Sequence, residues 1–123
     1  MNAQRRRREA GVIADMILHD NCSLVSLRGA LRYQDRAELV AAVDRSLDAG
    51  CARVVLDLRH VHFIDSVALG LLALTYRRLE SCQREFGLLM PTEQVSKLLM
   101  ISGIPKIVPI YHSEREAIGC TVP

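Results

Sequence analysis

The sequence predicts a single α/β domain built on a mixed β-sheet, and three observations support this fold class. Segments with strand and helix patterns alternate in the order β-β-α-β-α-β-α-β-α, which is typical of parallel strands joined by crossover helices. The length of 123 residues suits one domain with an ordinary hydrophobic core, and half of the residues are apolar. No repeat, low-complexity segment or internal linker interrupts the pattern.

A hairpin is expected to open the domain. Residues 12–18 and 22–27 read as two short strands, because apolar and β-branched residues dominate both segments. Asp20 and Asn21 lie between the two segments, and this pair of residues favours a tight turn. Gly29 is expected to close the second strand.

The first helix and the central strand follow the hairpin. Asp35 and Glu38 have the spacing of a capping box, so a helix is predicted to begin at Asp35 and to stop at Gly50. Residues 53–58, RVVLDL, form an apolar run that is rich in β-branched residues and bounded by turns. A run of this kind predicts a buried central strand.

The C-terminal half continues the alternation, with apolar residues at helical or strand spacing between capping and turn residues. The expected elements are a helix over residues 67–82, a strand over 86–90, a helix capped by Thr92 and ended by Gly103 and Pro105, a short strand over 107–111, and a last turn capped by Ser113. We therefore expect one compact domain over residues 11–119.

Composition excludes several classes of protein. No stretch reaches the ~18 uninterrupted apolar residues that a membrane span needs, and the N-terminus lacks the features of a secretory signal, so we expect a cytoplasmic protein. The four cysteines form no C-x-x-C pair, which predicts free thiols rather than a zinc site or disulfides. Trp is absent and few residues are aromatic, which argues against a stacking platform for single-stranded nucleic acid. No motif predicts a cofactor.

The basic charge is concentrated in a short leader over residues 1–10. Four consecutive arginines, residues 5–8, contribute +4 to a net charge of +2, so the rest of the chain sums to −2. The favoured interpretation of the leader is a solvated, disordered tail. A non-specific electrostatic contact with nucleic acid or anionic lipid is the alternative. Because the domain itself is nearly neutral, we expect no direct nucleic-acid partner.

The segment FIDSVALGLL places Asp65 and Ser66 where an apolar strand becomes an apolar helix. Ser66 is predicted to cap this helix, and a serine in that position stabilises a helix by about 1 kcal/mol. The turn behind it, residues 67–70, holds no acid, and Asp65 is expected to lie outside the helix. Ser66 therefore has two readings, as a plain cap or as a site where phosphate can be added without loss of the fold.

The segment VVLDLRHVHFIDSVALGLL resembles the signature of the STAS domain as found in anti-sigma factor antagonists. Residues 25–29 resemble the second strand of that family with its glycine, and residues 98–104, LLMISGI, resemble its late helix. The likeness covers most of the chain. It implies a mixed sheet with helices packed mainly on one side.

The resemblance also implies a function. Antagonists of this type have no catalysis of their own; they bind an anti-sigma factor, often a serine kinase, and thereby free a sigma factor. The kinase phosphorylates the serine that matches Ser66 and ends the binding, and a phosphoserine phosphatase restores it. Asp65 is then expected to shape and charge the site. The docking edge is expected to consist of Val67, Ala68, Leu69 and Gly70.

The chain departs from the family pattern in two segments. Val67 and Ala68 stand where the family commonly has serine and glycine, and Leu31 and Arg32 stand where many members carry an acid two or three residues beyond the glycine. Arg32 near Ser66 would oppose the usual phosphotransfer geometry or hold the phosphate. An alternative function follows from Val67, Ala68 and the basic leader: a STAS accessory subunit of a membrane transport or signalling assembly that is never phosphorylated. A homodimer is left open.

Other chemistries have weaker support. His60 and His62 alternate just past the central strand, but no third residue stands at a persuasive spacing for a metal, so solvated loop histidines are favoured. Asp57 and Asp65 are candidate paired carboxylates, although Asp57 is expected simply to end the buried run. The flanks of Ser66 do not match the G-x-S-x-G nucleophile elbow of hydrolases. We therefore predict that the protein is not an enzyme.

Overall fold

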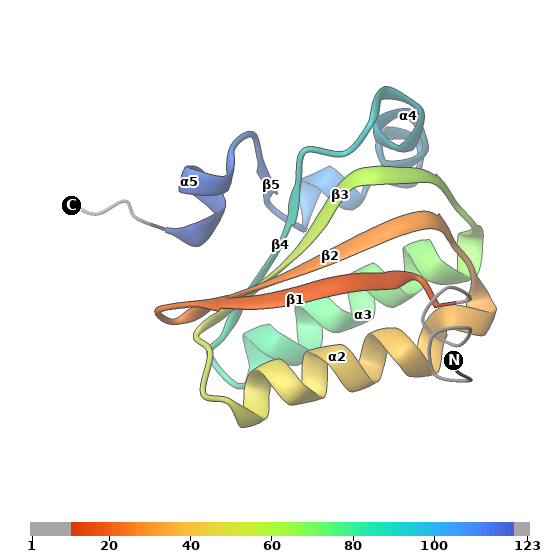
Figure 1. Ribbon diagram of the computed structural model, residues 1–123. Helices are drawn as coiled ribbons and strands as arrows, with labels where there is room; N and C mark the ends of the chain where they lie inside the picture. Colours follow the sequence, from red (N-terminus) through yellow and green to blue (C-terminus); the bar gives the residue numbers. More distant parts are fainter. Residues whose placement is uncertain (1–10, 120–123) are drawn as a thin grey trace.

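The computed structural model describes residues 11–119, so the predicted leader over residues 1–10 lies outside the described residues. The elements follow the expected order, with two short 3₁₀ helices added (Figure 1). Five strands form one sheet in the order β1-β2-β3-β4-β5, with β1 antiparallel to β2 and every other pair parallel. The bounds of the strands are β1 Ile13–His19, β2 Cys22–Leu31, β3 Arg53–Ile64, β4 Glu85–Leu89 and β5 Ile110–Tyr111.

The helices divide unequally between the two faces of the sheet. Figure 1 shows α2 and α3 side by side along one face, and an ion pair between Arg78 and Asp44 joins the two helices. The short α5 covers part of the second face, where its Ala117 packs into a small separate cluster with Leu24 and Val55. The bounds of the helices are α2 Arg36–Asp48, α3 Ser66–Ser81, α4 Glu93–Ser102 and α5 Glu114–Ile118.

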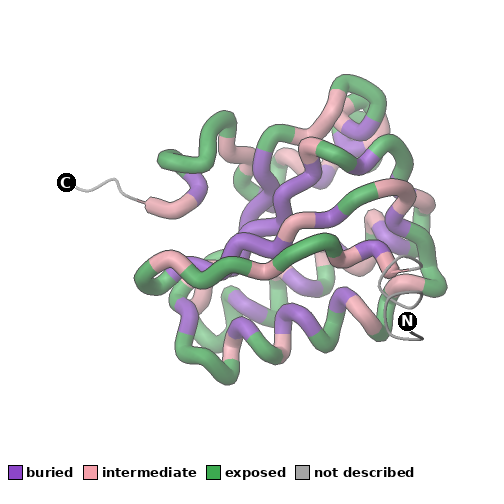
Figure 2. Tube along the Cα trace, viewed as in Figure 1, coloured by how far each residue is buried: buried purple, intermediate pink, exposed green. Residues whose placement is uncertain are grey.

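The main core lies between the sheet and the pair α2 and α3, and α4 adds Val95 and Leu99 to it. Figure 2 shows buried positions running along the sheet and along the inner faces of α2 and α3. Alternate residues of β3 point to opposite faces, so that Val54 and Leu56 enter the main core while Val55 enters the small cluster. The prediction of a mixed sheet with helices mainly on one side is confirmed.

Capping residues were predicted correctly at two helices. The Thr92 hydroxyl accepts a hydrogen bond from the Val95 N–H (3.3 Å), and the Ser113 hydroxyl accepts one from the Glu116 N–H (3.1 Å). Gly103 follows α4 with a φ of 81°, the left-handed conformation that favours glycine at the end of a helix.

The predicted capping box at Asp35 and Glu38 is wrong. The chain first forms the 3₁₀ helix η1, Tyr33–Asp35, and α2 begins at Arg36 with no side-chain cap. Glu38 accepts instead from two backbone N–H groups at the start of the described chain, those of residues 12 and 13 (3.2 and 3.1 Å). A tertiary contact with the first strand has therefore replaced the local bond that the spacing suggested.

Two strands are longer than predicted and one is shorter. The second strand does not close at Gly29 but continues to Leu31, and the central strand continues to Ile64. The register between these strands shifts between Ser26 and Arg28 and again after Gly29. These irregularities break the two-residue alternation, which is why the extension resembled a loop in the sequence. The last strand spans only Ile110–Tyr111.

No helix within residues 11–119 is both long enough and apolar enough to cross a bilayer.

Candidate functional site

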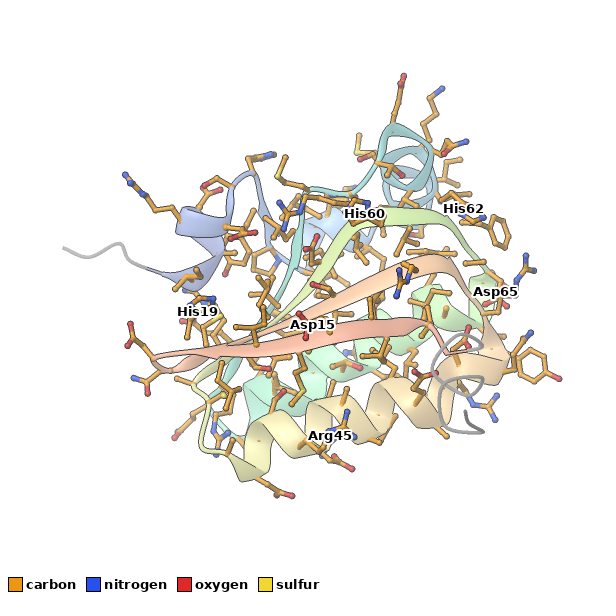
Figure 3. The ribbon with its side chains drawn as sticks, in the orientation of Figure 1. Asp15, His19, Arg45, His60, His62 and Asp65 are labelled. Atoms are coloured by element: carbon orange, nitrogen blue, oxygen red, sulfur yellow. The ribbon has the colours of Figure 1, made fainter. Side chains whose placement is uncertain are left out.

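Ser66 is the first residue of α3 and is exposed to solvent. The preceding strand carries Ile64 into the core, where its side chain is 1% exposed, and the chain then turns outward at Asp65. Asp65 has an extended backbone with φ −84° and ψ 173°, whereas Ser66 is already helical. The serine therefore lies at the carboxyl end of the central strand, the end at which Figure 3 labels Asp65 and His62.

Asp65 caps α3, and the prediction that Ser66 is the cap is wrong. The Ala68 N–H donates to Asp65 Oδ1 at 2.8 Å, and the Leu69 N–H donates to the Asp65 carbonyl at 2.9 Å. The first turn itself holds no acid, as expected, but the Asp65 carboxylate lies directly at the helix end. The inference that this end lacks a charged partner is therefore also wrong, because Asp65 supplies the charge.

The same carboxylate joins two loops. The Tyr33 N–H donates to Asp65 Oδ2 at 2.9 Å, and the Asp65 N–H donates to the Leu31 carbonyl at 3.1 Å. The segment between β2 and α2 is thus fastened to the junction between β3 and α3. Any partner that contacts Ser66 meets both segments.

The hydroxyl of Ser66 makes no hydrogen bond with any residue in the described range 11–119. Its position contrasts with Thr92 and Ser113, whose hydroxyls are occupied in capping α4 and α5. Because Asp65 performs the capping, a chemical change at the Ser66 hydroxyl removes no bond that the fold uses.

The four residues of the predicted docking edge have different environments. Val67 is 48% exposed, and Gly70 is exposed, with open space where a side chain would stand. Ala68 is fully buried, because it packs between α3 and the sheet, and Leu69 is only half-exposed against the core. Ala68 is therefore not presented to a partner, and the exposed part of the edge consists of Ser66, Val67 and Gly70.

Sequence reasoning missed Leu74, which is 63% exposed and continues this edge along α3. Positions 67, 70 and 74 are separated by three and four residues, the spacing that places side chains on one face of a helix. The signal was present in the sequence, but α3 is apolar on nearly every side. A core position and an exposed apolar position could not be told apart from the pattern alone.

Arg32 lies over an aromatic ring beside the site. Its guanidinium carbon is 5.1 Å from the centre of the Phe63 ring, and that of Arg36 is 5.4 Å from the centre of the Tyr33 ring. Tyr33, Arg36 and Phe63 were also missed by sequence reasoning. Their proximity to Ser66 depends on the pairing of β2 with β3 and on the bond between Tyr33 and Asp65.

The residues of the other candidate sites do not form a catalytic or metal site in the structure. Asp57 and Asp65 lie eight positions apart along an extended segment, and at roughly 3.3 Å per residue this distance is far too long for paired carboxylates. His60 and His62 belong to β3 rather than to a loop, and both are exposed (Figure 3). No cluster of metal-binding side chains occurs among residues 11–119.

Asp57 has a structural environment. It is 3% exposed and receives two side-chain hydrogen bonds from Arg59, at 3.0 and 2.7 Å, and one from the Arg59 N–H at 3.0 Å. Burial by itself would raise the pKa of Asp57, but the hydrogen bonds and the charge of Arg59 outweigh it and hold the pKa below its ordinary value. The carboxylate is thus ionised and fully occupied inside the sheet.

Together these features describe a small binding domain that presents an uncommitted serine beside exposed apolar and aromatic side chains. Comparison with known proteins gives the family: the chain belongs to the STAS domain family, whose model matches residues 14–117. Several relatives and structural neighbours of the chain are anti-sigma factor antagonists, a group that is generally not enzymatic.

Three similar proteins illustrate the relationship. An anti-sigma F factor antagonist of Paenibacillus polymyxa is 29% identical over 105 residues, which cover 85% of this chain and 90% of the relative. The crystal structure of an anti-sigma factor antagonist from Mycobacterium paratuberculosis superposes with a TM-score of 0.74 at 27% identity, covering 85% of this chain and 88% of that one. The unphosphorylated antagonist SpoIIAA shares the fold with a TM-score of 0.69 at 20% identity, over 83% of this chain and 90% of that one.

Proposed function

We propose that this protein is an anti-sigma factor antagonist that binds and sequesters an anti-sigma factor with serine kinase activity, and that phosphorylation of Ser66 switches the binding off. A phosphoserine phosphatase is the expected partner that restores the active form. The observation that supports this proposal best is the free hydroxyl of Ser66, exposed at the start of α3 while Asp65 caps the helix.

The position of Ser66 suits a switch that acts on the surface and leaves the fold intact. A phosphate adds about −1.5 to −2 charges at neutral pH, and a charge of this sign is tolerated at a helix N-terminus. The nearby Asp65 carboxylate remains bound to the Ala68 and Tyr33 N–H groups and gives the added phosphate a neighbour of like charge. The phosphate is therefore directed outward, toward the partner.

The docking edge supplies the contact that the phosphate would interrupt. Val67 and Leu74 present apolar surface on either side of Gly70, where the helix backbone is uncovered. Apolar side chains in the centre of an interface contribute most when water is excluded from them. A doubly charged phosphate next to Val67 would keep water at this centre and weaken the interface.

The test compares two substitutions with the unmodified chain. Ser66→Ala removes an unbonded hydroxyl and should bind candidate anti-sigma factor kinases as the original protein does. Ser66→Asp places a charge at the same point and should weaken binding at least tenfold, which corresponds to about 1.4 kcal/mol. Affinity is measured by calorimetry, and mass spectrometry after incubation with kinase and ATP locates the modified residue.

Ser81→Asp is the matched control, because it adds the same charge to an exposed serine at the opposite end of α3. It should leave partner affinity unchanged. Equal weakening by Ser81→Asp and Ser66→Asp, or modification of a residue other than Ser66, would contradict the proposed switch.

A second function is favoured by Val67, which replaces a small residue of the family pattern with exposed apolar surface directly beside Ser66. In this case the domain is an accessory subunit of a membrane transport or signalling assembly and is not phosphorylated. Affinity capture separates the two functions: a transporter ATPase recovered without a sigma-factor regulator supports the second, and an anti-sigma factor supports the first.

A further inference from the structure

Two arginines and two aromatic residues form one exposed surface next to the docking edge. We call it the arginine–aromatic patch, and it consists of Arg32 over Phe63 and Arg36 over Tyr33. The Tyr33 and Phe63 side chains are 54% and 36% exposed. Each ring thus has one face near a guanidinium and still meets solvent, an arrangement that holds the arginines on the surface.

The patch is fixed in position relative to Ser66. The hydrogen bond from the Tyr33 N–H to Asp65 Oδ2 holds one half of the patch against the residue that precedes Ser66. Phe63 lies three residues before Ser66 in the chain. Within the sheet, Phe63 of β3 is the partner of Ala30 of β2. A protein that docks over Ser66 and Val67 therefore reaches the patch without any change in conformation.

The two guanidinium groups of the patch are not paired with the surrounding described acids, although those acids keep their charges. Asp35 accepts from the Arg32 N–H at 2.8 Å, Asp65 caps α3, and Glu38 accepts from the start of the described chain. Each of these carboxylates is thus occupied by backbone N–H groups. Among residues 11–119, neither Arg32 nor Arg36 has a carboxylate within ion-pair distance.

We propose that the arginine–aromatic patch binds an acidic segment of the partner protein. This inference rests on the proposed function, and the sign of the switch supports it. A phosphate on Ser66 repels an acidic surface and competes for the same arginines, whereas it would strengthen the attachment of a basic one. A switch that ends binding therefore requires a partner surface that is acidic, or at least not basic, at this point.

The composition of the patch suits a protein partner rather than nucleic acid. Arginine, tyrosine and phenylalanine are enriched in the centres of protein interfaces, and the patch adjoins the apolar side chains Val67 and Leu74. A nucleic-acid surface would need a longer array of cations to contact successive phosphates. Only two arginines make up the patch, and the Asp65 carboxylate is bound to the Tyr33 N–H beside them.

The first test removes both charges with the double variant Arg32→Gln and Arg36→Gln. Affinity for the anti-sigma factor identified through the proposed function should fall about tenfold at low salt, which corresponds to about 1.4 kcal/mol. The salt dependence of binding should also become weaker. Arg45→Gln is the matched control, because Arg45 is exposed on the same helix as Arg36 and lies away from Asp65 in Figure 3.

A loss shared equally by the control, or no loss in the double variant, overturns the inference while leaving the Ser66 switch intact. If no anti-sigma factor binds, the proposed function fails and a second measurement decides the inference. In that measurement, the side-chain Nε–H signals of Arg32 and Arg36 are followed by NMR during titration with a synthetic peptide of alternating glutamate and leucine.

The peptide should shift the signals of Arg32 and Arg36 and leave that of Arg45 unchanged, and the shifts should disappear in the double variant. Equal shifts at Arg45, or none at the patch, contradict the inference. A parallel titration with oligothymidylate distinguishes the other class of partner. Tighter binding of oligothymidylate than of the peptide at the same salt concentration would assign the patch to nucleic acid and overturn the inference.

Discussion

The arginines on the α5 face and those of the arginine–aromatic patch differ in their ion pairs. Both groups include guanidinium groups over aromatic rings, Arg53 over Tyr111 among them, but the described acids pair only with those on the α5 face. On the α5 face, Arg53 donates to Glu85 at 2.7 Å, and Arg59 bridges Asp57 and Glu114 at 2.7 and 2.6 Å. In the arginine–aromatic patch, next to the docking edge, Arg32 and Arg36 lie against aromatic rings. The acids near the patch bind backbone N–H groups. Arginine side chains thus form ion pairs that stabilise the fold in one region and, within the described residues, remain without ion pairs at the surface in the other.

The α5 face directs its polar groups inward. An Arg53 N–H donates to the Ala117 carbonyl at 2.9 Å, which fastens α5 to the sheet. Cys22 lies under the same helix, and burial raises the pKa of its thiol to about 11. The contacts of these residues therefore hold α5 on the sheet.

Near the docking edge, residues that stabilise the fold and residues that face solvent lie within a few positions of one another. Asp65 satisfies the backbone of α3 and of η1, so Ser66, Val67 and the arginine–aromatic patch are left to face outward. Substitutions on the α5 face should therefore change stability and spare binding. Those at the docking edge should change binding, except at Asp65, which serves both.

The largest effect on stability is expected from Asp57→Ala. The substitution removes a buried carboxylate that accepts three hydrogen bonds from Arg59 and leaves that guanidinium without its main partner. Breaking a buried pair in this way costs about 3 kcal/mol, near the low end of the usual range because Arg59 is partly exposed. Urea unfolding measures the loss, and affinity for the partner should be unchanged.

Asp57 also predicts how stability depends on pH. Its pKa in the folded state is lowered, so its contribution is complete above the unfolded pKa of about 3.9 and disappears as the pH falls through the folded value. The original protein should therefore lose stability below about pH 4, and Asp57→Ala should show a smaller loss over that range. Identical acid profiles for the two proteins would contradict the assignment.

The next effect in size is expected from Asp65→Ala, which removes both the cap of α3 and the acceptor of the Tyr33 N–H. Stability should fall by about 1–2 kcal/mol, as for other lost caps. Partner affinity should fall as well, because the arginine–aromatic patch loses its anchor. Asp65→Asn is the control, since asparagine also caps helices, and it should preserve most of the stability. If Asp65→Ala binds the partner with unaltered affinity, the proposal that the Asp65 carboxylate holds the arginine–aromatic patch in its binding position is contradicted.

Much of the fold could be predicted because local signals agreed with one another. Thr92 was identified as a cap because it precedes an apolar helical pattern, and Ser113 because it precedes a short terminal turn. Asp65 and Ser66 are both good caps in adjacent positions, and helical periodicity does not distinguish between them. The structure selects Asp65 because the chain is still extended at that residue and its carboxylate meets two separate segments.

The binding surface was harder to predict because it is assembled by tertiary contacts. Phe63 belongs to β3 and Arg32 directly follows β2, and the long parallel pairing of these two strands brings the residues together. In the sequence, Phe63 belongs to an apolar run and resembles a core residue. Exposure of Phe63 and Leu74 follows from which side of each element is covered, and one sequence does not contain that information.

The smallest predicted effect on stability is a gain rather than a loss. It arises at Gly70, where two substitutions can distinguish an effect on stability from an effect on binding. Gly70→Ala places a methyl group in open space on α3, so the helix should gain about 0.5–1 kcal/mol of stability from reduced chain entropy in the unfolded state. If α3 docks along Val67, Gly70 and Leu74, the larger Gly70→Gln should weaken partner binding at least tenfold in a fully folded protein, an effect of about 1.4 kcal/mol on binding alone. Ser81→Gln adds similar bulk at the far end of α3 and should leave affinity almost unchanged, although it removes the hydrogen bond from the Ser81 hydroxyl to the Arg78 carbonyl. Normal affinity in Gly70→Gln would remove the face of α3 formed by Val67, Gly70 and Leu74 from the interface and leave Ser66 and the arginine–aromatic patch as its centre.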